Sequence, residues 1–482
     1  MRVSEFYNLG KKQPSLEFLD VDIENDTRLF VNARAIRLLK SDFGDHCTDL
    51  LQGFFSELIN SIKRGDDDRA FTILSHLKEP NETHLGLSRG KSDGRGLGPA
   101  KAKEIWKSLR RSKAVKTGLV EDLEDTTLLI DGVSEDILSD IITNIIRGPL
   151  ISYTQSICEQ YSIPLAEEVS SGPVWNLNSK KWEVDFVSLP TPKNEKLILL
   201  PKSIVRINQD YKVSEYYRHY VLERLKEEEI LRNSELVDII KSGKNKGKPK
   251  VYKTDLMAKY GTKEKAVSIE QTQNYPDLLK EYKKDHSAPT PALSHRQIAD
   301  ALETDVPDWK KLLNDVTSLD PGRKEAYRYE EAILDLVKAL FHPVLVDPDT
   351  QTPIHNGLKR VDITFTNYSR SGFFEWLNRN YRCPYVFIEC KNFGEELGNP
   401  EIDQIAMRLS KQRGMFGMIM CRKIENRDRL LERCRAVAKD DDKFIIVLDD
   451  NDLEELVDEA SILFPQDFEF KLLKNYFQKL VF

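Results

Sequence analysis

Hydrophobic positions recur with two different periods along this chain. In residues 47–63 and 135–146 the apolar residues return every three or four positions, which is typical of amphipathic helices. Residues 173–207 are instead rich in β-branched and aromatic residues interrupted by prolines, so this pattern predicts strands. Another helix is predicted over 213–230. The N-terminal half is therefore expected to be an α+β region.

The segment 236–305 differs in composition from the sequence on either side. It is polar and rich in lysine, which predicts a charged helical or linker segment. The basic run Lys241–Lys253 within it is typical of a flexible, solvated linker. The segment would separate an N-terminal recognition or regulatory region, 1–235, from a C-terminal domain, 306–482.

The C-terminal domain has the clearest alternation of predicted elements. A helix at about 323–341 precedes three strands, of which the first two are separated by a turn at 347–353. Helices and strands then alternate to about residue 460. Two of the strands are KRVDITFT (359–366) and YVFIECKN (385–392), connected by a loop. The order α-β-β-β-α-β-α-β-α predicts a mixed sheet flanked by helices. The expected fold class is thus α/β in this domain and α+β overall.

Composition limits the kind of protein further. A chain of 482 residues, 40% hydrophobic and 31% charged, is typical of a soluble protein with about two or three domains. No apolar run approaches the roughly 20 residues that span a bilayer, and no apolar signal segment is present at the N-terminus. A cytoplasmic protein without a membrane partner is expected. The six cysteines form no CxxC pair and the eight histidines no cluster, which argues against a zinc site and a disulfide framework.

Ionisable residues interrupt two of the apolar strands. Because side chains alternate across a strand, Asp362 lies opposite its apolar neighbours, and Glu389 and Lys391 share one face of the later strand. Burying such charges is unfavourable unless they pair or bind a cation. Mg²⁺ prefers oxygen ligands, so Asp362, Glu389 and the Cys390 backbone carbonyl are candidate ligands, with Mn²⁺ as an alternative ion. Lys391 would lie beside the attacking water and the charge that develops on a phosphate.

This arrangement resembles the PD-(D/E)XK nuclease superfamily, which has the restriction-endonuclease-like fold. Asp362 followed by Glu389–Lys391, each in an apolar strand, matches its motif. Glu330, in the preceding predicted helix, matches the glutamate of the FExxVxxLL helix of Mrr-type members. The resemblance covers roughly residues 310–450 and departs from the family pattern at Val361, where many members have proline.

The resemblance implies Mg²⁺-dependent hydrolysis of DNA, with DNA favoured over RNA. Glu330, Asp362 and Glu389 would then hold the metal, and Lys391 would position or activate water. Gln404, in the helix after the second strand, would complete the catalytic site. A nuclease joined to a large unassigned region is typical of a bacterial antiviral defence effector, which that region would restrain. A homodimer or a controlling partner protein is also expected.

Other interpretations stay open. The tripeptide acid-x-Lys is weak alone, since it recurs at Asp308–Lys310 and Glu469–Lys471. In a purely structural interpretation Asp362 and Lys391 form a cross-strand salt bridge, while Glu389 lies at an exposed end of the sheet. The protein would then be a non-catalytic DNA-binding or scaffold protein with a nuclease-like fold. A structure-specific repair or junction-resolving nuclease is a further alternative.

A second candidate site lies in residues 89–116, which contain ten lysines and arginines and two acids. Residues 96–105, GLGPAKAKEI, follow the GxGxxxAxxI spacing of a helix-hairpin-helix, in which glycines let backbone amides approach a phosphate. Phosphate contacts act locally, so the net charge of −7 does not exclude them. A glycine-rich loop before a helix with a solvated basic face is an equally open alternative. The candidate nucleic-acid contacts are Arg95, Lys101, Lys103, Lys107, Arg110 and Arg111.

Overall fold

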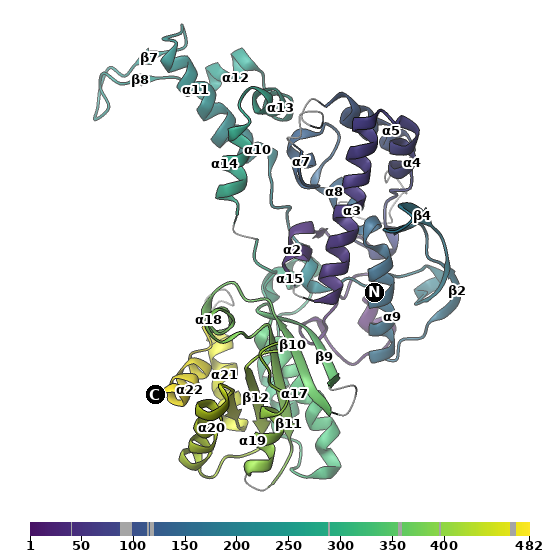
Figure 1. The fold of residues 1–482 in the computed structure, drawn as a ribbon, viewed down its shortest axis with the longest axis vertical. Coiled ribbons are helices and arrows are strands. Elements are labelled where there is room, and N and C mark those ends of the chain that lie inside the picture. The colour runs from purple at the N-terminus through teal and green to yellow at the C-terminus, as the bar shows by residue number, and fades with distance from the viewer. Residues whose placement is uncertain are drawn as a thin grey trace.

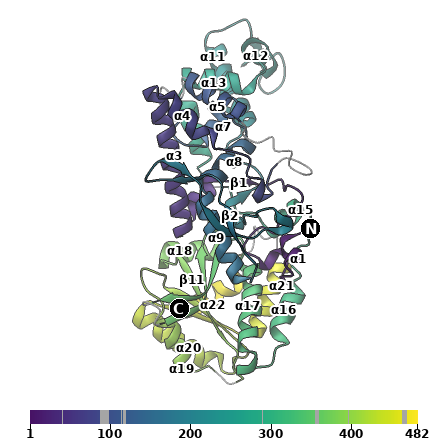
Figure 2. The same ribbon diagram turned by 90° about the vertical axis from the view of Figure 1, so that its right-hand side faces the viewer.

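A C-terminal sheet with its helices occupies one end of the molecule, and a mainly helical N-terminal part occupies the other (Figures 1 and 2). The predicted α+β class is confirmed. All six cysteines are free thiols. Within the described chain, no helix has the length and apolar character of a membrane span. The computed structural model describes residues 1–39, 41–86, 99–112, 115, 120–287, 290–354, 359–394, 397–462 and 469–482.

A long helix, α3 (Asp42–Arg64), is the centre of the N-terminal part. It begins where the Ser41 hydroxyl accepts a hydrogen bond from the Gly44 N–H, and it ends at Gly65, whose φ of 76° is left-handed. Its apolar face is buried, with Phe54 fully inaccessible to solvent. The other helices of this part are α1 (Val3–Phe6), α2 (Ala33–Leu38), α4 (Asp67–Ser75), α5 (Pro99–Arg111), α7 (Asp125–Leu129), α8 (Glu135–Ile145), α9 (Arg147–Gln160), α10 (Val213–Tyr216) and α11 (Leu222–Leu231).

The strands of the N-terminal part are short and pair two at a time. Helices predicted at 47–63, 135–146 and 213–230 are confirmed, as are strands between 173 and 189. Of the predicted strand over 196–207, only two residues pair as a strand. The strands are β1 (Phe30–Val31), β2 (Ala166–Ser170), β3 (Val174–Asn176), β4 (Lys181–Glu183), β5 (Phe186–Leu189) and β6 (Val205–Arg206).

The segment 236–305 is folded rather than extended. A hairpin of β7 (Asp238–Ile239) and β8 (Pro249–Lys250) is closed by the Gly247 N–H, which donates to the Ile240 carbonyl at 2.8 Å. The interpretation of Lys241–Lys253 as a flexible linker is therefore corrected, because this run continues the hairpin into the next helix. The helices that follow are α12 (Lys253–Tyr260), α13 (Glu264–Asn274), α14 (Asp277–Asp285) and α15 (His295–Leu302).

The predicted C-terminal mixed sheet is confirmed. Its strand order is β13-β12-β11-β10-β9. The β9–β10 and β10–β11 pairs are antiparallel, and the β11–β12 and β12–β13 pairs are parallel. The strands are apolar because helices cover them, and all six residues of β12 are buried. The strands are β9 (Leu345–Ile354), β10 (Lys359–Asn367), β11 (Tyr385–Lys391), β12 (Phe416–Cys421) and β13 (Phe444–Leu448).

Two local predictions for this domain are wrong. Residues 347–353, expected to be a turn, belong to β9, and the expected loop between β10 and β11 contains a helix, α18. Aromatic residues explain that helix, since Phe373 and Phe374 are buried against the domain core. The helices here are α16 (Trp309–Thr317), α17 (Ala326–Phe341), α18 (Gly372–Tyr381), α19 (Asn399–Ala406), α20 (Arg427–Asp441), α21 (Asp450–Ile462) and α22 (Lys471–Val481).

A buried ion pair joins the N-terminal part to α17 of the C-terminal domain. Lys338 Nζ lies 3.0 Å from Glu17 Oε2 and donates to the Tyr161 hydroxyl oxygen at 3.2 Å, and Tyr161 donates to Glu17 at 2.6 Å. The two charged side chains are 3% and 6% exposed. Burial alone would raise the pKa of Glu17, but the Lys338 ammonium and the Tyr161 hydroxyl lower it below its ordinary value. The Glu17 carboxylate is thus favoured in its charged form.

Replacing Lys338 with alanine should leave the Glu17 carboxylate buried without a counter-charge. We expect the free energy of unfolding, measured by urea denaturation, to fall by about 3–5 kcal/mol. The exposed helical pair Lys311–Asp315 provides the control, since Lys311→Ala should change stability by at most about 1 kcal/mol. Equal effects of the two substitutions would mean that the Glu17–Lys338 pair does not join the two parts in solution.

Candidate functional site

The pairing of β10 with β11 brings Asp362 and Glu389 together. Ile363 pairs with Ile388 in this antiparallel ladder, so the next residues on each strand, Asp362 and Glu389, lie opposite each other. The Cys390 N–H donates to Asp362 Oδ2 at 2.9 Å, which fixes the aspartate carboxylate at the strand. The convergence of these residues, predicted from alternation along the strands, is observed.

Glu330 reaches the same edge of the sheet from the first turns of α17. Gln351 on β9 donates its side-chain N–H to Glu330 Oε1 at 2.8 Å. Burial raises the pKa of Glu330, and the negative charge of Asp362 raises it further, while the hydrogen bond from Gln351 opposes the change. The carboxyl groups of Glu330 and Asp362 are therefore close enough to interact. Glu331, the neighbouring acid, is exposed instead.

Glu389 is the most deeply buried member of the group. Its side chain is 0% exposed, and Lys391 Nζ lies 3.3 Å from its Oε2. The second oxygen forms an ion pair with Nη1 of Arg408, which lies just after α19 and is itself 7% exposed. The structural interpretation from the sequence is wrong in two respects, because Lys391 pairs with Glu389 rather than with Asp362, and Glu389 is not at an exposed end.

Arg408 was not among the residues predicted for the site. It lies four positions after Gln404, one helical turn further along the predicted helix, and this spacing was the available signal. Gln404 itself has an exposed side chain on α19. Gly417 on β12 explains the approach of α19, because a Cβ there would lie 2.7 Å from Ile405 Cδ1. The helix can thus lie against the sheet and deliver Arg408 to Glu389.

The donor types suit a hard divalent cation, but one donor is already engaged. Asp362, Glu330 and the Cys390 carbonyl offer oxygen ligands of the kind that Mg²⁺ prefers. Glu389 has a cation at each carboxylate oxygen. Within the described ranges, no three His, Cys, Asp or Glu side chains are grouped so that they could hold a metal. Metal binding by Glu330, Asp362, Glu389 and Cys390 stays a prediction, and it requires Glu389 to change partners.

The second predicted site is partly described. Helix α5 buries Ala102, Ile105 and Leu109. Its opposite face exposes Lys103, Lys107, Arg110 and Arg111, and Arg110 forms an ion pair with Asp67 at 2.9 Å. Arg95, the side chain of Lys101 and residues 96–98 of the GLGP sequence lie outside the described residues. The part that is described is an amphipathic helix with a solvated basic face.

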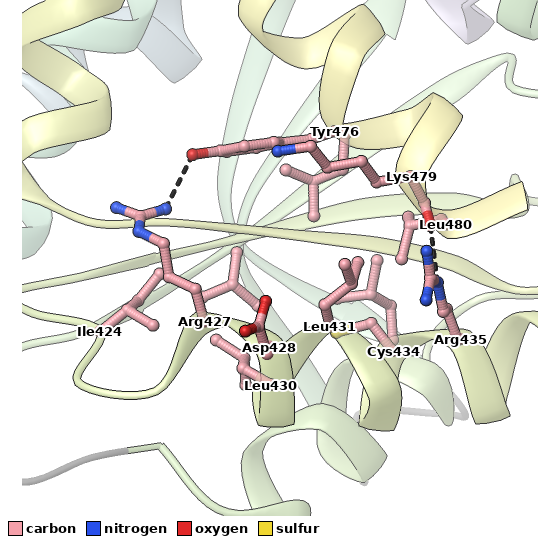
Figure 3. Close-up of a pocket in the computed structure, with 13 residues that line it drawn as sticks. Ile424, Arg427, Asp428, Leu430, Leu431, Cys434, Arg435, Tyr476, Lys479 and Leu480 are labelled. Carbon is pink, nitrogen blue, oxygen red and sulfur yellow. Dashed lines mark hydrogen bonds between the residues drawn. The ribbon is translucent and has the colours of Figure 1, made fainter. Parts of the chain in front are cut away.

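A separate pocket of about 350 Å³ lies between α20, β13 and α22 (Figure 3). Arg427 donates to the Tyr476 hydroxyl at 2.7 Å, and Arg435 donates to the Lys479 carbonyl at 2.6 Å. Apolar side chains such as Leu430 form much of its wall. None of the predicted catalytic or metal-binding residues lines it, so it is distinct from the carboxylate site.

Comparison with known proteins gives a family match in the N-terminal part and one partial relative. A family model described as "Domain of unknown function (DUF8370)" matches residues 8–212. A segment of 101 residues is 33% identical to the putative transposon gamma-delta 80.3 kDa protein of Escherichia coli (strain K12). That segment spans 21% of this chain and 14% of the relative. No solved structure matches the chain. The family match ends before α17, so it does not include the candidate site.

Replacing Glu389 with alanine tests the ion pairs at the site. Arg408 and Lys391 would be left without their buried counter-charge, so we expect the free energy of unfolding to fall by about 3–5 kcal/mol in chemical denaturation. Glu375→Ala, which removes the helical partner of the exposed Arg379 at the surface of the same domain, should change it by at most about 1 kcal/mol. An effect of Glu389→Ala as small as that of the control would contradict the described pairing.

Proposed function

We propose that the C-terminal domain hydrolyses phosphodiester bonds of DNA in a reaction that depends on a divalent cation. The observation that supports this best is the meeting of Asp362, Glu389 and Lys391 on adjacent apolar strands, with Glu330 on the helix beside them. Burying charged groups among apolar residues is energetically unfavourable, so a cluster of them in an apolar sheet indicates a binding or catalytic role. The mixed sheet and the α17 helix also agree with the fold that the PD-(D/E)XK resemblance implies.

Each residue has a role in this proposal that follows from its position. Asp362, oriented by the Cys390 N–H, would hold Mg²⁺ or Mn²⁺ together with Glu330, Glu389 and the Cys390 carbonyl. The chemistry supplied by such a bound ion is Lewis-acid polarisation of the phosphate and a lower pKa for water. Lys391, on the same face as Glu389, orients the attacking water and stabilises negative charge on the phosphate.

The N-terminal part is proposed to restrain the nuclease. Its Glu17 and Tyr161 bind Lys338 on α17, the helix that also bears Glu330. A conformational change in the N-terminal part could therefore move Glu330 through a single helix, α17, with no other element in between. Restraint of this kind agrees with an effector that acts when triggered. The antiviral role, DNA as substrate and a homodimer stay predictions.

A non-catalytic DNA-binding or scaffold protein is the second candidate function. One specific observation favours it, namely that both oxygens of Glu389 are paired with cations in a buried position. Such a pair can serve as a purely structural element. The two functions differ in whether the protein takes up a divalent cation and cleaves nucleic acid.

Hydrolysis should depend on Lys391. We expect the wild-type protein to cleave supercoiled plasmid or linear duplex DNA with Mg²⁺ or Mn²⁺ and not with EDTA. Lys391→Ala should lower the cleavage rate by about 10²-fold or more, the usual effect of removing a group that stabilises developing charge. Gel electrophoresis of plasmid, linear DNA and single-stranded RNA substrates measures the rate and identifies the polymer cleaved.

Lys310→Ala is the matched control, because Asp308–Lys310 has the same acid-x-Lys spacing but lies on the exposed surface at α16. It should retain full activity. Equal rates for wild type and Lys391→Ala would remove the catalytic assignment. A wild-type protein that neither cleaves any of the three polymers nor takes up a divalent cation would instead support the scaffold function.

A further inference from the structure

Arg408 is held at the site by its backbone and not only by its charge. Its N–H donates to the Ile405 carbonyl at 2.9 Å. Its own carbonyl accepts two hydrogen bonds from the Arg413 guanidinium, at 3.2 Å and 3.1 Å. The Cα is therefore fixed beside the sheet, while the long side chain alone decides where the guanidinium lies. The side chain can change position without unfolding α19.

The guanidinium lies near both of the strand carboxylates that are proposed to bind metal. It pairs with Glu389. Burial lowers the pKa of Arg408, and the Asp362 carboxylate is close enough to oppose that change. Lys391 is on the other oxygen of Glu389. Arg408 thus supplies a positive charge close to two of the acids that would hold a divalent cation.

The guanidinium is not fully satisfied in this position. Its Nε is buried, and no hydrogen-bond partner for it is found in the described part of the chain. A buried donor without a partner destabilises the arrangement that holds it, and a guanidinium has five N–H groups to satisfy. The pairing of Arg408 with Glu389 is therefore one that a stronger ligand for the carboxylate can displace.

We infer that Arg408 is an internal counter-ion, which occupies Glu389 in the metal-free protein and must leave before a divalent cation binds there. This inference rests on the proposed function. Arg408 is a positioning residue in it, since it acts through Glu389. Metal uptake then requires breaking an ion pair, so the measured metal affinity is lower than the carboxylates alone would give.

Divalent-cation binding by the full chain tests this inference without any measurement of cleavage. Arg408→Gln keeps a polar side chain but removes the charge, and it should bind Mn²⁺ about 5–150-fold more tightly than wild type. Arg408→Lys keeps the charge and should remain near the wild-type affinity. Isothermal titration with Mn²⁺ measures the affinities, and the metal-induced rise in melting temperature measures them again independently.

The experiment distinguishes a failure of the Arg408 inference from a failure of the proposed function. Equal Mn²⁺ affinity in wild type and Arg408→Gln, or weaker binding in the variant, overturns the role of Arg408 and leaves the nuclease proposal standing. No Mn²⁺ uptake by any of the proteins overturns both. Should Arg408→Gln fail to fold, Arg408→Lys together with Arg408→Met decides the matter, because only the uncharged variant should gain affinity.

A second and independent observation concerns the hairpin between Ile239 and Lys250. Residues 241–250 are all exposed, and they include five lysines and no acid. Gly243 and Gly247 adopt φ values of 87° and 86°, so the turn that presents these lysines has a defined shape. Figure 1 shows β7 and β8 projecting beyond the helices around them. The projection presents positive charge on a chain whose net charge is −7.

The charges on this hairpin are not neutralised by the protein itself. Among the described residues, none of the lysines within 241–250 forms an ion pair; the pairs nearby involve Lys253 and Lys259. Lys250 Nζ lies 4.2 Å from the ring centre of Tyr252, which is 44% exposed. Ile239, which pairs with Pro249 across the hairpin, is 55% exposed. Ammonium groups without a carboxylate partner, next to an exposed aromatic ring, suit a polyanion with flat bases.

We infer that this hairpin, Ile239–Tyr252, binds the phosphate backbone of a nucleic acid. It would thus provide a second region of contact with the substrate class of the proposed function, away from the carboxylate site. A variant with Lys244, Lys246, Lys248 and Lys250 replaced by glutamine should bind a duplex DNA oligonucleotide more than tenfold more weakly at low salt. The slope of log affinity against log salt concentration should become shallower by about 0.9 for each phosphate that the variant no longer neutralises.

Fluorescence anisotropy in EDTA measures this binding without cleavage, so the result does not depend on the nuclease proposal. The control variant replaces four exposed lysines elsewhere, Lys263, Lys280, Lys284 and Lys310, and should bind as wild type does. A control that weakens binding equally overturns the inference, because binding would then follow total charge. Displacement of the DNA by polyglutamate at equal charge concentration also overturns it, in favour of an acidic polypeptide partner.

Discussion

The C-terminal domain depends on how it compensates the charge of Glu389 inside an apolar sheet. A fully buried carboxylate is tolerated there only because Lys391 and Arg408 each bring a positive charge to it. The strand supplies the first cation, two residues away on the same face. The second arrives from α19, which lies close to the sheet because Gly417 leaves room for Ile405. The packing of α19 on the sheet and the charge balance at Glu389 therefore depend on each other.

The balancing of the Glu389 charge by Lys391 and Arg408 also bears on the proposed chemistry. A buried ion pair is often less stabilising than apolar residues packed in the same place. Charges kept there therefore point to a role other than stability. Asp362, held by the Cys390 N–H, and Glu330, held by Gln351, lie at the same edge, so the local excess is of negative charge with two cations beside it. This is a suitable environment for exchanging an internal cation for an external one.

A second buried pair connects this edge to the rest of the molecule. Lys338 on α17 is paired with Glu17, and Tyr161 bonds to both. Because Glu330 belongs to the same helix, the N-terminal part contacts an element of the candidate site directly. The segment 236–305 is not a passive spacer either, since residues such as Leu256 and Tyr282 are fully buried. The buried pair at the junction, Glu17–Lys338, therefore constrains the position of α17.

Sequence by itself determined the features that follow from local periodicity. Alternation was enough to put Glu389 and Lys391 on one face of their strand and Asp362 opposite its apolar neighbours, because side-chain direction alternates with residue number. The register of β10 with β11, which the structure gives, then brings Asp362 opposite Glu389. The helical period likewise predicted α17. The alternation of helices and strands along the chain predicted a mixed sheet, but not the order of its strands. Only the tertiary structure decided the partner of Glu389. Arg408 reaches Glu389 from the end of α19, a different element. Which cation pairs with the buried carboxylate depends on how closely that helix can approach the sheet. That distance is set by packing between residues far apart in the chain, which no local pattern contains.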